Sequence, residues 1–299
     1  MKKFDNLLLK GLNYQKKNNF DEALKIYNEL IAQDNKNSQL LLFLGTLYLQ
    51  INNFNLAKDY LEQAFSIDKN NTLIINNLAI AYEKLEEKDK AISLLEKSIE
   101  ISQNNPETLF RIANLFSSEK KYKLAIKNYQ KAIELKPSFM FAYLNLGNAQ
   151  FESKFFEESI VSFEKAISFD RNFIPGYLNI CRALLKLEKY DQALKYSDEI
   201  IKLDNMNIHG NLIQGDINLI LKNFSNAIKN YEKIIKIDPK HSLVLGKLLH
   251  AKMYLNDWKN YKKLLGDIIK YIDKNIMVIH PSIFLPLTDQ PDLHLKASK

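Results

Sequence analysis

The feature that most constrains this chain is an internal repeat of 34 residues, which runs without an insertion through seven windows. The windows span 4–37, 38–71, 72–105, 106–139, 140–173, 174–207 and 208–241. Two positions in every window are small. They are Gly11, Gly45, Ala79, Ala113, Gly147, Cys181 and Gly215 at the eighth position, and Ala23, Ala57, Ala91, Ala125, Ser159, Ala193 and Ala227 at the twentieth. Agreement at two positions in strict register indicates a structural repeat rather than a compositional bias.

Each window has the pattern of two amphipathic helices, with apolar residues three and four positions apart. Asn and Lys fill the short turn between the helices, as in Asn52-Asn53 and Lys120-Lys121. Pro137 and Pro239 follow second helices, where proline ends a helix because it lacks the N–H group. We expect the small residue of the first helix to face the small residue of the second, which lets the two backbones approach closely.

The motif in these windows resembles the tetratricopeptide repeat (TPR) family. It consists of Leu-Gly, as at Leu146-Gly147, then the second small residue, an aromatic residue, and a polar stop such as Asp238-Pro239. The resemblance covers Phe4–His241. It implies an all-α solenoid of antiparallel helix pairs, twisted into a right-handed superhelix with a concave groove.

The pattern decays after His241. Residues 242–273 still fit a helix pair, but Leu249 and Tyr261 occupy the two small-residue positions. We interpret this pair as a degenerate eighth repeat, which is either a cap of the solenoid or a transition to another domain. Residues 274–299 form an irregular tail that resembles a connector.

The tail also resembles the junction of O-GlcNAc transferase/SPINDLY-type proteins, in the run from Val278 through His280-Pro281 to Pro286-Leu287-Thr288, after Trp258. In that family a TPR superhelix leads into a glycosyltransferase domain. The sequence ends at Lys299, so the resemblance implies no catalytic residue here. It does imply an alternative role, in which the chain recruits substrates for a glycosyltransferase domain that follows the tail.

Composition limits the other classes of function. The net charge is +7, but the basic residues are nearly all lysines spread among Asp and Glu, which favours a solvated surface over a nucleic-acid site. The single cysteine, Cys181, excludes an intrachain disulfide. No apolar run is long enough for a secretion signal or a membrane span, so the default expectation is a cytoplasmic protein.

No motif of a nucleotide-binding loop, dinucleotide fingerprint or zinc protease occurs in the sequence. The five histidines lack the spacing of metal ligands, and Cys181 fits a small packing position. We therefore expect no cofactor, no metal and no enzymatic activity from this chain alone.

Function is then expected on the first helices, where the TPR resemblance places the second, fifth, sixth, ninth, twelfth and thirteenth positions of each repeat in the groove. The sixth and ninth positions carry most of the polar candidates. The candidate groove residues are Asn77, Asn114, Asn145, Asn148, Asn179, Arg111 and Arg182. A side-chain amide both donates and accepts hydrogen bonds, so a row of asparagines can pair with a peptide backbone without reading its sequence. The sequence therefore predicts a protein or peptide partner in extended form.

The first helices suggest two further kinds of partner. Leu8, Leu9, Leu12, Leu42 and Phe43 predict an apolar end of the groove, which would suit an apolar peptide or a second copy of the chain. The carboxylate clamp of chaperone-binding TPR domains would need Lys and Arg after Asn114 and Asn145. The next repeat offers Pro175 and Asn179, which disfavours that role.

Overall fold

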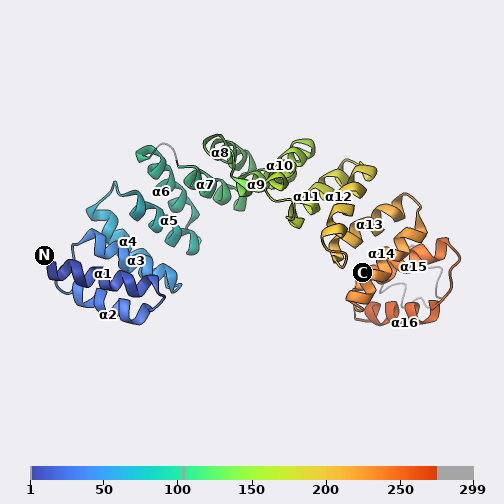
Figure 1. Ribbon diagram of the computed structural model, residues 1–299, viewed down its shortest axis with the longest axis horizontal. Coiled ribbons are helices and arrows are strands. Elements are labelled where there is room, and N and C mark those ends of the chain that lie inside the picture. Colours follow the sequence, from blue (N-terminus) through green and yellow to red (C-terminus); the bar gives the residue numbers. More distant parts are fainter. Residues whose placement is uncertain (1, 103–104, 275–299) are drawn as a thin grey trace. The chain divides into compact units, whose positions relative to one another are not determined.

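The computed structural model describes residues 2–102 and 105–274, and all regular structure in these ranges is α-helical (Figure 1). The first helices of the pairs are α1 (Lys2–Lys16), α3 (Ser38–Gln50), α5 (Thr72–Lys84), α7 (Pro106–Ser118), α9 (Met140–Glu152), α11 (Ile174–Lys186), α13 (Ile208–Ile220) and α15 (Ser242–Tyr254). The second helices are α2 (Phe20–Ile31), α4 (Phe54–Ile67), α6 (Lys88–Ile101), α8 (Tyr122–Leu135), α10 (Phe156–Phe169), α12 (Tyr190–Leu203), α14 (Phe224–Ile237) and α16 (Tyr261–Ile272). The all-α expectation is confirmed.

The chain divides into two compact units, residues 1–149 and 150–299, with the division near the end of α9. Within each unit every helix packs against the next one along the chain. The core is correspondingly a series of local clusters. One joins α1, α2 and α3, and another joins α14, α15 and α16. Stability in such an array comes mainly from contacts between neighbouring repeats.

Three of the eighth-position glycines, Gly11, Gly45 and Gly215, lie against a large side chain at the twenty-fourth position of the same repeat. A methyl carbon placed on Gly11 would lie 2.6 Å from Cε1 of Tyr27, and one on Gly215 would lie 2.5 Å from Cε1 of Tyr231. A carbon on Gly45 would overlap the side chain of Leu61. The expectation that small residues face each other is thus incomplete, because at these repeats the space above the glycine is filled by a ring or a leucine.

Cys181 shows the same constraint in reverse. It is the largest eighth-position residue of the seven windows, and its Sγ lies 3.5 Å from the carbonyl oxygen of Ala193, the small residue of the second helix. The twenty-fourth position of this repeat holds Ser197, the smallest residue at that place in the seven windows. Both Cys181 and Ser197 are fully buried. In the sixth repeat, the larger side chain on the first helix is thus matched by a smaller side chain on the second helix. Such compensation is expected because protein interiors are close-packed.

The turn inside each pair depends on one residue in the left-handed backbone region. The fifteenth position of all eight pairs has positive φ, at Asn18, Asn52, Glu86, Lys120, Lys154, Glu188, Lys222 and Asn256. The N–H of the following residue donates back across the helix end, as from Phe155 to the carbonyl oxygen of Gln150 at 2.9 Å. This is the Schellman ending of a helix, at which glycine is the usual residue. None of the eight is a glycine.

Asparagines also cap several helices. The side-chain oxygens of Asn37, Asn53, Asn71, Asn105 and Asn207 accept backbone N–H groups at helix starts. Such caps satisfy N–H groups that the helix leaves without an internal partner. Much of the asparagine content is therefore structural, and these residues are separate from the candidate groove asparagines.

The last pair departs from the repeat register. The pattern predicts that its second helix starts at Trp258, but α16 begins at Tyr261, after Asn260, which has positive φ. Leu249 is buried in one cluster with Ile268 and Leu264, so the large residue at the eighth position is accommodated in a core formed by α14, α15 and α16. Of the expected tail, residues 274–299, all but Lys274 lie outside the described residues.

The apolar end predicted for the groove is mostly core. Leu8 and Leu42 are buried, and Phe43 stacks on Tyr27 with ring centroids 6.3 Å apart. Leu9 alone of the five is largely exposed, at 63%. The prediction was wrong for Leu8 and Leu42, because Leu8 is buried in the cluster of the first three helices and Leu42 in the next cluster, with residues of α4 and α5.

We expect Ala125→Leu to lower the free energy of unfolding by about 1–3 kcal/mol, because Ala125 is fully buried beside Tyr129 and Leu146. Urea unfolding followed by circular dichroism measures the change. Lys127→Leu, at an exposed site on the same helix, is the control and should change stability little. An unchanged unfolding midpoint for Ala125→Leu would show that α7 and α8 do not approach closely there.

We expect Lys154→Gly to raise the free energy of unfolding by about 0.5–1 kcal/mol. The exposed Lys154 has φ of 67°, a conformation that is strained for an L-residue and open to glycine. Lys195→Gly, at an exposed site inside α12, should instead lower stability by about 1 kcal/mol. Thermal or urea unfolding of both variants would reveal the opposite signs, and two losses would contradict the strained-turn interpretation.

Candidate functional site

Polar side chains link consecutive first helices by one recurring geometry. The sixth position of a repeat donates a hydrogen bond to the ninth position of the repeat before it. The three bonds are Asn77 Nδ2 to Thr46 Oγ1 at 3.2 Å, Asn145 Nδ2 to Asn114 Oδ1 at 2.9 Å, and Lys247 Nζ to Asp216 Oδ2 at 2.5 Å. The two positions that the sequence singled out for binding therefore lie side by side on neighbouring helices.

Buried tyrosines hold the ninth position from the other side. Tyr129 donates its hydroxyl to Asn114 Oδ1 at 2.7 Å, and Tyr231 donates to Asp216 Oδ1 at 2.8 Å. These tyrosines occupy the twenty-fourth position, and they are 1% and 0% exposed. Asn114 and Asp216 are thereby each fixed by their own repeat and by the next repeat at once.

The first repeat uses a longer side chain for the same purpose. Tyr27 donates to Gln15 Oε1 at 2.8 Å, and Gln15 Nε2 donates to Gln50 Oε1 at 2.8 Å. Gln15 is buried although it is polar. A buried tyrosine hydroxyl needs a partner, and the glutamine supplies one while it joins α1 to α3.

The pair formed by Asn114 and Asn145 keeps hydrogen-bonding groups that its own bonds do not use. Asn114 Oδ1 accepts from both Tyr129 and Asn145, which occupies both of its lone pairs. The amide hydrogens of Asn114 and the carbonyl oxygen of Asn145 take no part in these bonds. Both side chains are partly exposed. The pair thus offers one donor group and one acceptor at fixed positions.

The other candidate residues are more engaged with the protein. Arg111 donates to the carbonyl oxygen of Asn76 at 3.3 Å and pairs with Glu83 at 3.2 Å. Arg182 donates to Asn179 Oδ1 at 3.3 Å, and its guanidinium carbon lies 4.7 Å from the centre of the Phe151 ring. Both arginines therefore brace the first helices. Arg182 remains exposed, whereas Arg111 is partly buried.

Burial controls the ionisation of this network. Burial raises the pKa of the Tyr129 hydroxyl to about 12, although hydrogen bonds with Asn145 and Ser117 oppose the rise. The pKa of Tyr231 is also raised, first by burial and then by the charge of Asp216. The neutral hydroxyl is the form that donates to the ninth position. At neutral pH both tyrosines therefore keep the network intact.

Sequence reasoning missed the hydrogen bonds that hold the candidate groove residues in place. The pattern marks Thr46 and Tyr129 only as a groove position and a core aromatic, and it does not mark Asp216 and Lys247 as a pair. The signal was available in principle, since Asp216 and Lys247 are 31 residues apart, the same separation as Asn114 and Asn145.

The described ranges contain no cluster of three His, Cys, Asp or Glu side chains that could hold a metal ion. Burial raises the pKa of the Cys181 thiol to about 12, which leaves it a poor nucleophile at neutral pH. In the described part of the chain, no helix combines the length and the apolar character that crossing a membrane requires. The residues that carried the glycosyltransferase resemblance, from Val278 onward, lie outside the described residues.

Three models of the tetratricopeptide repeat match the sequence. A TPR repeat model matches residues 113–154, and two tetratricopeptide repeat models match residues 14–60 and residues 74–105, 142–173 and 209–241. Together they cover more than half of the chain. The chain belongs to the tetratricopeptide repeat family. No curated protein sequence matches it.

Solved structures share this fold. The C-terminal part of a TPR repeat-containing protein from Cytophaga hutchinsonii is 20% identical, with a TM-score of 0.73 over 81% of this chain and 99% of that chain. MamA is 27% identical, with a TM-score of 0.52 over 54% of this chain and 94% of that one. YrrB, described as a TPR protein with an unusual peptide-binding site, is 16% identical, with a TM-score of 0.54 over 62% of this TPR chain and 95% of its own.

We expect Tyr129→Phe to lower the free energy of unfolding by about 0.5–1.5 kcal/mol at neutral pH, because the variant loses the bond to Asn114. The pKa of Tyr129 is raised in the folded state, so folding favours the neutral hydroxyl. Its contribution to the free energy of unfolding is fully present below about pH 10 and is lost as the pH rises towards about 12. The difference between wild type and variant should therefore shrink over that window.

Urea unfolding at several pH values between neutral and about pH 12 measures this difference. Tyr122→Phe, on the same helix, is the control, because Tyr122 is only partly buried and does not bond to Asn114. A difference between wild type and Tyr129→Phe that stays constant up to the highest pH would contradict the role assigned to the hydroxyl.

Proposed function

We propose that this TPR protein is a non-enzymatic scaffold that binds an extended polypeptide along its first helices. The observation that carries the proposal is the pair Asn114 and Asn145. The two side chains are hydrogen-bonded to each other, and Tyr129 orients Asn114. Asn77, Asn148 and Arg111 are the further contacts in the first unit, and Asn179 and Arg182 are the candidate contacts of the second unit. We place the scaffold in the cytoplasm, with Cys181 reduced.

The chemistry of the pair favours an extended ligand. A helical peptide satisfies its own backbone N–H and C=O groups, except at its ends. An extended peptide leaves both kinds of group available along its length. The amide hydrogens of Asn114 can donate to a ligand carbonyl, and the oxygen of Asn145 can accept a ligand N–H. Such contacts recognise the backbone and tolerate many side chains.

Pre-organisation supports the same proposal. Asn114 and Asn145 are held by three helices, because Tyr129 comes from α8 while the asparagines belong to α7 and α9. Side chains that are already fixed lose less conformational entropy when a ligand binds. The description of YrrB as a TPR protein with a peptide-binding site is consistent with this class of function.

The alternative is that the chain recruits substrates for a glycosyltransferase of the O-GlcNAc transferase/SPINDLY type. This alternative rests on the tail sequence and stays a prediction, as does the homodimer suggested by the leucines of the first repeats. Leu9, the one largely exposed side chain of that set, is a small surface for a dimer.

A double variant tests the scaffold proposal without damaging the fold. Asn114→Asp with Asn145→Lys copies the natural pair Asp216 and Lys247. In that pair, Asp216 accepts one hydrogen bond from Tyr231 and another from Lys247. The carboxylate introduced at position 114 would still accept from Tyr129, but it would have no amide hydrogens for a ligand. We expect this variant to fold normally and to bind peptides at least about tenfold more weakly, which corresponds to about 1.4 kcal/mol.

The ligand can be found by selecting a displayed library of random peptides on the wild-type protein. Calorimetry then gives the Kd of each selected peptide for the wild type, the double variant and Asn128→Asp. Asn128 is a partly exposed asparagine of the second helix α8, so its replacement should leave the Kd unchanged. Equal affinities for the wild type and the double variant would contradict the assignment.

A further inference from the structure

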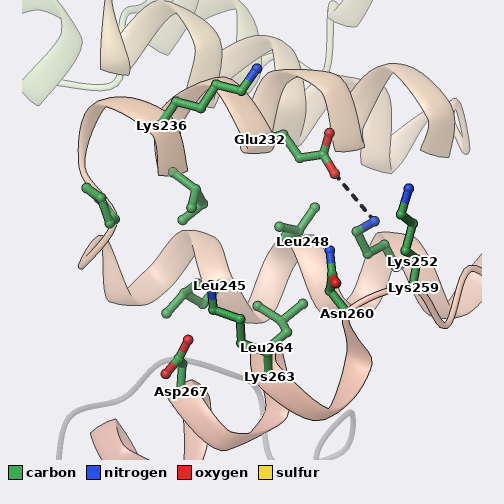
Figure 2. A pocket seen from close by; sticks show the side chains of 12 residues that line it. Glu232, Lys236, Leu245, Leu248, Lys252, Lys259, Asn260, Lys263, Leu264 and Asp267 are labelled. Carbon is green, nitrogen blue, oxygen red and sulfur yellow. Dashed lines mark ion pairs between the residues drawn. The ribbon is translucent and has the colours of Figure 1, made fainter.

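A hollow of about 330 Å³ lies between α14, α15 and α16 in the second unit (Figure 2). Its apolar lining comes from all three helices and the turn after α14, as Ile235, Pro239, Leu245, Leu248 and Leu264. Figure 2 shows Leu248 and Leu264 near the centre, with Lys236 and Lys259 at the edges. The volume is at the lower end of the range for ligand pockets and suits one or two apolar side chains.

The charges around the hollow are unbalanced. Four lysines line it, at positions 236, 252, 259 and 263, against two carboxylates, Glu232 and Asp267. Asp267 is paired with Lys270 at 3.0 Å. Lys252 is paired with Glu232 at 3.4 Å and with Asp257 at 2.7 Å. The carboxylates near the hollow are therefore already engaged by these two lysines.

The other three lysines differ from Lys252. Within the ranges that the structure describes, the ammonium groups of Lys236, Lys259 and Lys263 form no ion pair with a carboxylate. Helix α16 also begins at this hollow, with Asn260 among the lining residues, and its N-terminus adds a partial positive charge. The rim is thus positive while the floor is apolar.

An equivalent hollow elsewhere in the chain lacks this charge. It has a volume of about 470 Å³ and lies between α4, α5 and α6, at matching repeat positions. There Ser93 replaces Lys263 and Asp89 replaces Lys259, while Glu62 bonds to the hydroxyl of Tyr82. Of these two hollows, only the hollow of the last pair has a positive rim, because Lys90, the one lysine that lines the other hollow, is paired with Glu87 at 2.5 Å.

We propose that the hollow between α14, α15 and α16 binds an acidic peptide segment that carries an apolar side chain. The apolar side chain fills the space over Leu248 and Leu264, and flanking carboxylates pair with Lys236, Lys259 and Lys263. This site is separate from the asparagine pair, so it does not depend on the scaffold proposal. Electrostatic attraction of this kind weakens as salt is added.

The test uses the full chain and an acetylated peptide of sequence Glu-Asp-Leu-Phe-Asp-Glu. Calorimetry at low and high salt gives its Kd. The only tryptophan, Trp258, precedes Lys259 and is 53% exposed, so its fluorescence reports binding at this place. We expect saturable binding with a change in Trp258 emission. A peptide with serines in place of Leu-Phe, and one with lysines in place of the acids, should both bind at least about tenfold more weakly.

Matched variants locate the site. Lys236→Glu with Lys263→Glu reverses two lining lysines on α14 and α16, and should weaken binding at least about tenfold. Lys233→Glu with Lys262→Glu reverses two exposed lysines of the same helices that do not line the hollow, and gives the same change in net charge. This control should bind like the wild type.

Three outcomes would overturn the proposal. One is an absence of peptide binding to the wild type. Another is equal loss in both double variants, which would indicate general attraction to a basic surface. The third is concentration-dependent dimerisation of the wild type that only the lining variant abolishes, which would make a second copy the occupant. The Asn114→Asp, Asn145→Lys variant should bind this peptide normally, so failure of one site is distinguishable from failure of the other.

Discussion

The helix pairs and their polar surface depend on a buried tyrosine at the twenty-fourth position, which packs against the first helix and also donates a hydrogen bond to the ninth position. The ring of Tyr231 lies over Gly215, where no side chain would fit, and its hydroxyl reaches Asp216. The hydroxyl of Tyr129 reaches Asn114 in the same way. Packing between the two helices of a pair and the orientation of the polar surface are therefore consequences of one side chain. A change in the ring would disturb both.

The sequence predicted the helices and their order because the repeat register is set by packing. A small residue at two fixed places in each window leaves few alternatives to a closely packed helix pair. The register failed at the last pair, where α16 starts at Tyr261 and not at Trp258. Leu249 is larger than the eighth-position residues of the other repeats, and only the three-dimensional fit of α15 and α16 determines where the second helix begins.

The candidate site was less predictable. The positions of Asn114 and Asn145 followed from the family pattern, but their bond to each other and to Tyr129 did not. The shared separation of 31 residues marks which polar residues could pair, but it does not show which of them come within hydrogen-bond distance. The same limit explains Leu8 and Leu42, whose apolar character fits either an exposed groove or a core. The pairing of Arg111 with Glu83 likewise depends on the distance between α5 and α7.

The bond between the sixth and ninth positions also restricts which repeats can be neighbours. Asp216 suits a following repeat that carries Lys247, whereas Thr46 and Asn114 are followed by repeats that carry asparagine. If the seventh repeat were moved to precede the third, Asp216 would meet Asn77 in place of a cation. Asn77 could still donate a hydrogen bond to Asp216, but the negative charge of the carboxylate would lose its cation. Gene duplication in such an array therefore preserves the charge balance only where an acidic ninth position is followed by a basic sixth position. The charges at the sixth and ninth positions therefore restrict the order in which the repeats can follow one another.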